Sequence, residues 1–94
     1  MNNTLHTPAP WKCDLVSLKI WANDGNTEIA RTSSDVSISE EEANAHLIAA
    51  APELLDLLEA AVARVQIANE EGNPILSAWL PDALSALRKA KGEA

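Results

Sequence analysis

Several residue types that usually mark a reaction mechanism are rare in this sequence of 94 residues. The single cysteine, Cys13, excludes an internal disulfide, and the only histidines, His6 and His46, form no Cys/His cluster with metal-ligand spacing. Phenylalanine and tyrosine are absent, and only three glycines occur, so a glycine-rich loop that cradles phosphate is not expected. We therefore assign no catalytic, metal or cofactor-binding residue, and the sequence predicts neither an enzyme nor a bound cofactor.

Basic residues are also scarce, with 7 Lys and Arg against 14 Asp and Glu, which gives a formal net charge of −7. A surface of this sign repels phosphate backbones, so direct binding to nucleic acid is disfavoured. The one basic cluster, Arg88, Lys89 and Lys91, fits the last turn of a helix, where cations compensate the helix dipole. No segment approaches the about 20 apolar residues that cross a bilayer, and no signal peptide is visible, so a cytoplasmic protein without a membrane segment is expected.

What the sequence does contain is an apolar fraction of 47%, which is ordinary for a globular protein. Its length fits a single domain over residues 1–94. A chain of this size buries a modest core, so formation of a homodimer would add stability.

The N-terminal half has the pattern of extended structure. Residues 1–10 are polar and contain two prolines, which predicts an extended arm. Residues 11–31 predict a hairpin or meander of two to three strands, because Leu18, Ile20 and Ala22 alternate with Lys19 and Trp21. Residues 23–26 predict a tight turn, since an Asp-Gly pair supplies the positive φ angle that such turns require.

The C-terminal half, residues 39–91, has helical periodicity. Ser39 and Glu42 predict a capping box at its start, and Pro52 predicts a kink or a new helix because proline removes a backbone hydrogen bond. Gly72 marks the next turn, and Pro81 places the true start of the last helix near Leu80. The predicted helices cover about residues 40–51, 53–69 and 75–91. Since a few short strands cannot bury a face alone, the sequence predicts an α+β fold in which a small antiparallel sheet packs against two to three helices.

The candidate interface residues are aromatic or acidic. Tryptophan is the only aromatic type, and its large ring suits a core anchor; alternatively, one ring is exposed as an interface hot spot. Two of the acidic candidates stand in a first helical turn, where the dipole alone favours negative charge, so a docking role is the alternative there. The candidates are Trp21, Trp79, Glu40, Glu41 and Asp24.

Two segments together resemble a known group of proteins. Residues 6–11 read HTPAPW and residues 44–55 read NAHLIAAAPELL. In this order and spacing they are similar to a widespread group of short proteins encoded by bacteriophages and prophages, which open with HTPGPW and carry an NAxLIAAAPxLL helix. The present chain has Ala9 where that group usually has glycine, and His46 where arginine is common. Without that arginine, an anion site at position 46 is not expected.

The resemblance implies a phage accessory protein that is made inside an infected or lysogenic bacterium. Proteins of this kind often bind and block a host machine, so the expected partner is a host or phage protein complex, for example a CRISPR–Cas defence complex. An alternative is a small-ligand or nucleotide-signal sponge that uses Arg31, Arg64 or Lys19 across an oligomer interface. A regulatory DNA binder is the third option, and the net charge argues against it.

Overall fold

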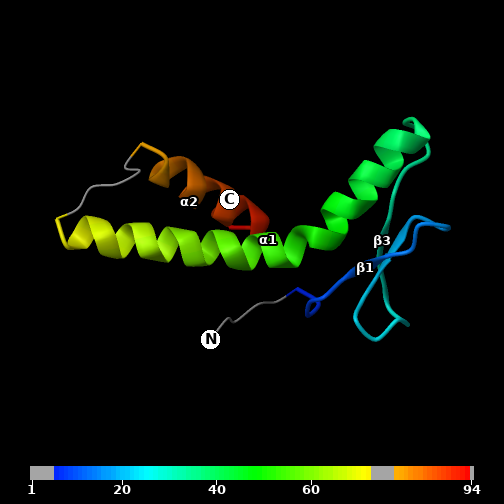
Figure 1. Ribbon diagram of the computed structural model, residues 1–94, viewed down its shortest axis with the longest axis horizontal. Helices are drawn as coiled ribbons and strands as arrows, with labels where there is room; N and C mark the ends of the chain where they lie inside the picture. The colour runs from blue at the N-terminus through cyan, green and yellow to red at the C-terminus, as the bar shows by residue number, and fades with distance from the viewer. Residues whose placement is uncertain (1–5, 73–77, 94) are drawn as a thin grey trace. The chain divides into compact units, whose positions relative to one another are not determined.

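The computed structural model describes residues 6–72 and 78–93, and these form a small antiparallel sheet and two helices (Figure 1). The elements are β1 (Lys12–Cys13), β2 (Lys19–Trp21), β3 (Glu28–Arg31), α1 (Ile38–Glu70) and α2 (Leu80–Ala90). The α+β class is thus confirmed. The chain forms two compact units, Met1–Glu53 and Leu54–Ala94, each described below by itself.

The sheet is a three-stranded meander in the order β1-β2-β3, with both pairs antiparallel. Ile20 pairs with Cys13 on one side and with Ala30 on the other, so these three residues share one face. Ile20 has no exposed surface, which makes it the anchor of this unit. The predicted strand region 11–31 is confirmed, although its strands are only two to four residues long.

A turn that the sequence did not signal separates β1 from β2. The Asp14 carboxylate accepts the Val16 N–H at 2.9 Å, and the Leu18 N–H donates to the Asp14 carbonyl at 2.7 Å. Leu18 adopts a left-handed φ of 56°, which is rare for a residue with a side chain. Because the turn contains neither glycine nor proline, its residues read as strand in the sequence.

The described part of the N-terminal arm folds back on itself. The Trp11 indole N–H donates to the Thr7 carbonyl at 3.0 Å, and the rings of His6 and Trp11 meet edge to face with centroids 6.0 Å apart. Residues 6–10 have no regular secondary structure, as expected for an arm, but they end in this closed turn. The first five positions of the predicted arm lie outside the described residues.

Helix α1 begins two residues earlier than predicted, and its cap is a different serine. The Ser37 carbonyl accepts the first helical N–H, from Glu41, at 2.9 Å. The Ser37 hydroxyl accepts the Glu40 N–H at 3.2 Å and donates to the Glu40 carboxylate at 3.3 Å. The predicted capping box of Ser39 and Glu42 is therefore wrong. Both serines are followed three residues later by a glutamate, and the sequence alone does not choose between the two registers.

Pro52 predicted a kink or a new helix, and the new helix is wrong, because α1 is a single helix from Ile38 to Glu70 (Figure 1). Proline lacks an N–H and so costs the helix one hydrogen bond. Ending the helix there would leave about four N–H and four carbonyl groups without helical partners at the two new ends. Continuing the helix through Pro52, which is buried, therefore loses fewer backbone hydrogen bonds than ending it there. The predicted helices 40–51 and 53–69 are one helix.

The unit Leu54–Ala94 is a helical hairpin in which α2 lies along the second half of α1 (Figure 1). Val62, Ala83 and Leu87 form its buried core. Partly buried side chains surround this core: Leu55, Leu58, Trp79, Leu80 and Leu84. An ion pair joins the two helices, with Lys91 Nζ 3.3 Å from Glu59 Oε2.

Helix α2 begins at Leu80 with proline in its first turn, as Pro81 indicated. The start predicted at residue 75 lies outside the described residues, and positions 78 and 79 form a turn. Arg88 and Lys89 lie in the last turn of α2, as expected from the helix dipole.

Candidate functional site

Asp24 closes the turn between β2 and β3. Its Oδ1 accepts the backbone N–H of Asn26 at 2.8 Å and of Thr27 at 3.0 Å, and its Oδ2 accepts the Thr27 hydroxyl at 3.0 Å. These bonds, led by that from Asn26, lower the pKa of the Asp24 carboxyl. Gly25 takes the positive φ of 75° that the sequence predicted. Asp24 therefore has a structural task in addition to any contact with a partner.

Trp21 is the last residue of β2 and is half-buried. Lys19 lies on the same strand, and its ammonium is 5.9 Å from the centre of the Trp21 ring, at the outer limit of a cation–π contact. Part of the ring therefore stays available at the surface. Its role in an interface stays a prediction.

Glu40 and Glu41 occupy the first turn of α1 but differ in what they contact. Glu40 is exposed and bonds to Ser37. Glu41 is half-buried and accepts the hydroxyl of Thr32, which follows β3, at 2.9 Å. Glu41 thus ties the start of α1 to the end of the sheet, while Glu40 is the one that faces solvent.

Trp79 lies in the other unit, directly before α2. It is half-buried and packs against the Val62, Ala83 and Leu87 core of the hairpin. The structure places Trp21, Asp24, Glu40 and Glu41 in the unit Met1–Glu53, and Trp79 in the unit Leu54–Ala94.

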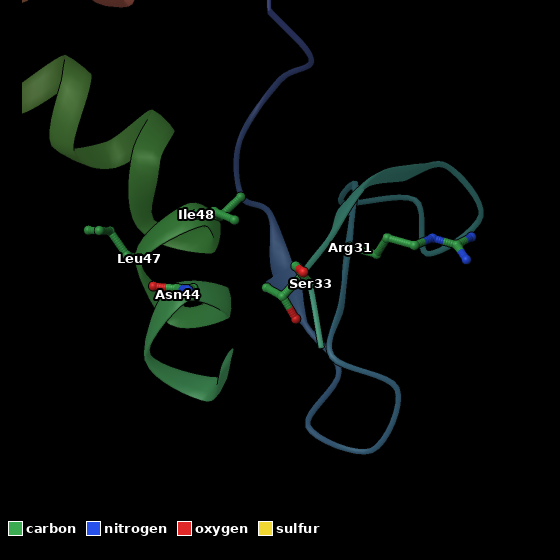
Figure 2. Close-up of a pocket in the computed structure, with 6 residues that line it drawn as sticks. Arg31, Ser33, Asn44, Leu47 and Ile48 are labelled. Carbon is green, nitrogen blue, oxygen red and sulfur yellow. The ribbon is translucent and has the colours of Figure 1, made fainter. Parts of the chain in front are cut away.

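A shallow groove of about 300 Å³ opens between the end of β3 and the first half of α1 (Figure 2). It is lined by Arg31, Thr32, Ser33, Asn44, Leu47 and Ile48. The Arg31 side chain extends away from α1 in Figure 2, because its guanidinium binds Glu28 instead. The groove is therefore walled by hydroxyl, amide and aliphatic groups, without a cation directed into it.

One surface next to this groove was not predicted from the sequence. Glu40, Ala43 and Leu47 are all exposed and recur at intervals of three and four residues, so they lie on one side of α1, here named the outer face of α1. Leu47 is 63% exposed. The spacing of Leu47 and Ala43 does not show which side of the helix faces solvent, and Figure 2 shows the Leu47 side chain pointing away from the strands.

Cys13 does not have the surroundings of a reactive thiol. It is half-buried, and burial followed by the negative charges of Asp14 and Glu42 raises its pKa, which favours the unreactive thiol over the thiolate. Within the described ranges, no three His, Cys, Asp or Glu side chains gather in a way that would hold a metal ion.

The sequence model of one protein family, described as Salmonella phage P22 protein Y8K6, matches residues 1–94. The chain belongs to this family. The match covers every residue, and it confirms that the chain belongs to a family of phage proteins, as expected from the sequence.

Neither the curated proteins nor the solved structures contain a significant match to this member of the P22 Y8K6 family. Among its described residues, no helix combines the length and the apolar character that crossing a membrane requires.

Proposed function

We propose that this member of the P22 Y8K6 family is a phage accessory protein that acts inside the host cell by binding a host protein complex. Inhibition of a defence complex of the CRISPR–Cas type is the specific form of the proposal. The protein would act by occupying a surface on its partner, so it needs no catalytic residue and no cofactor.

The observation that carries the proposal is the outer face of α1. An exposed leucine and a carboxylate on one side of a helix offer apolar area for the centre of an interface and charge for its rim. Leu47, which lines the groove, supplies the first, and Glu40, on the same side of α1 near its start, supplies the second. The net charge of −7 adds long-range attraction to a basic channel, of the kind that holds nucleic acid in a defence complex.

A pull-down from a lysate of the host bacterium tests the proposal, with the tagged full-length chain as bait and mass spectrometry as readout. A complex that handles nucleic acid should be retained at low salt and lost as ionic strength rises, because the attraction between exposed charges is screened. Retention that does not respond to salt, or no retained complex of this type, would contradict the proposal.

A matched pair of variants locates the surface. Leu47→Ser should abolish the capture, since it removes the apolar centre of the outer face of α1. Val16→Ser changes a side chain that is 96% exposed in the turn before β2, and should leave the capture intact. Equal loss in both variants would argue against this face.

Homodimer formation, expected from the small core, stays a prediction. Size-exclusion chromatography with light scattering tests it directly.

A further inference from the structure

The sheet has a second face, opposite the one that carries Cys13, Ile20 and Ala30. The register pairs Trp21 with Lys12 on β1 and with Glu28 on β3, and pairs Lys19 with Arg31. Residues directly opposite each other in antiparallel strands share a face. These residues form what is here named the cationic sheet face: Lys12, Lys19, Trp21, Glu28 and Arg31.

Contacts among the side chains of β2 and β3 confirm that these four point to the same side, and the register places Lys12 with them. Arg31 Nε and Nη2 donate to the two oxygens of the Glu28 carboxylate at 2.8 and 2.9 Å. Lys19 Nζ lies 3.8 Å from the same carboxylate and 5.9 Å from the Trp21 ring centre. Two cations therefore bind one carboxylate, and one of them, Lys19, also lies near the indole ring.

The net charge of the cationic sheet face is opposite in sign to that of the rest of its unit. Residues 1–53 contain eight acidic and only three basic residues, and all three basic residues, Lys12, Lys19 and Arg31, lie on the cationic sheet face. Glu28 is the one acid on the three strands. Asp14 and Asp24 stand in the turns at the ends of the strands, where backbone N–H groups occupy their carboxylates. The charge of this unit is thus segregated.

Glu28 shows how the face holds an anion. The two parallel bonds from Arg31 have the fork geometry with which arginine binds a carboxylate or a phosphate. The Arg31 bond lowers the pKa of the Glu28 carboxyl, so this internal anion stays charged at neutral pH and competes with any anion from outside. Lys12 is exposed and forms no ion pair with a described residue, so its charge is available.

We propose that the cationic sheet face binds a nucleotide, with the base against Trp21 and the phosphate on the cations of this face. An aromatic ring among cations suits a ligand that has both a flat base and a phosphate, because stacking and ion pairing then act together. An acidic peptide would use the cations alone. A long nucleic acid would extend over surface of the opposite charge, which the net charge of −7 disfavours. This site is independent of the outer face of α1 and of the proposed host partner.

The test is a ¹H–¹⁵N NMR titration of the full chain with adenosine monophosphate at low salt. The three indole N–H resonances report on three separate places: Trp21 on the cationic sheet face, Trp11 in the N-terminal turn and Trp79 in the helical hairpin. The Trp21 resonance should shift and saturate while the other two stay in place. Inorganic phosphate and adenosine, titrated separately, should each bind more weakly than the nucleotide.

Charge variants sharpen the titration. Lys12→Gln should weaken binding about two- to fivefold, the range of an exposed ion pair, and Glu28→Gln should strengthen it by a similar factor because it removes the internal competitor. Lys89→Gln makes the same charge change at an exposed position in α2 and should have no comparable effect.

Three results would overturn the proposal. The first is a Trp21 resonance that does not move at millimolar nucleotide. The second is equal weakening by Lys12→Gln and Lys89→Gln, which would indicate a response to net charge alone. The third is a polyglutamate peptide that binds as tightly as the nucleotide, which would assign the face to an acidic protein.

Discussion

The two units of this protein are stabilised internally by different kinds of interaction. In Met1–Glu53, polar side chains define the structure: Asp14 and Asp24 close the two turns, and Thr32 binds Glu41. In Leu54–Ala94, apolar packing dominates, with Val62, Ala83 and Leu87 at the centre. Strands of two to four residues form few ladder bonds, so side chains must supply the remaining partners. Helices satisfy their own backbone, and packing then decides their arrangement.

The largest predicted effect tests the apolar unit. Leu87→Ala should lower the free energy of unfolding by about 2–4 kcal/mol, because it removes buried methyl groups and leaves a cavity in a small core. Urea denaturation followed by far-UV circular dichroism measures the change. Leu57→Ala, at a position 68% exposed, is the control and should change stability by less than about 0.5 kcal/mol. Similar losses in both variants would contradict the assigned core.

A smaller effect tests the polar unit at the start of α1. Ser37→Ala should cost about 1 kcal/mol, the usual value for loss of an N-cap. Ser39→Ala, at the position that the sequence favoured, should be nearly neutral because Ser39 lies inside the helix. The same denaturation assay compares them. A larger loss from Ser39→Ala would restore the capping box predicted from the sequence.

The turns of the polar unit should respond to acid. Hydrogen bonds lower the pKa of Asp14 and Asp24 in the folded state, so their contribution is fully present above the unfolded value of about 3.9 and disappears as pH falls through the lower folded values. Comparing stability at pH 7 and pH 3 should show this loss. Asp24→Asn keeps an oxygen acceptor but cannot titrate, so it should reduce the pH dependence. An unchanged pH dependence in this variant would show that the turn carboxylate is not responsible.

The smallest effect concerns Cys13, which lies in the polar unit on the buried side of the sheet. Its raised pKa predicts slower alkylation by iodoacetamide at neutral pH than that of N-acetylcysteine. Asp14→Asn removes one of the charges responsible and should speed the reaction modestly. The same acceleration from Asp82→Asn, in the apolar unit, would show that the effect does not come from a neighbouring charge.

The sequence correctly predicted those turns and helix ends that are determined by adjacent residues in the chain. Asp24 and Gly25 encode their turn directly, and Pro81 marked the start of α2. It failed where two local solutions compete: two serines offer equivalent caps, and a proline inside an apolar helical run is compatible with an end or with continuation. The turn at 14–18 was missed because Leu18 adopts a left-handed conformation that its residue type does not signal.

The candidate sites were predicted less well, since they depend on which side of an element faces solvent. Leu47 and Ile48 are adjacent and similar, yet Leu47 is exposed and Ile48 is half-buried. The grouping of Lys12, Lys19 and Arg31 follows from strand register, and a two-residue β1 in register with β2 gives no periodic pattern to read.

The continuity of α1 has a consequence for cooperativity. One hydrogen-bonded helix supplies residues to both units, so neither can lose its part of α1 without creating a new helix end. Pro52, which lacks an N–H, lies at the boundary between the units. Of all positions in the helix interior, this is where an opening costs one hydrogen bond fewer. Amide exchange in α1 should therefore divide into two protection classes at Pro52, which would make the proline the border between two folding units of one helix.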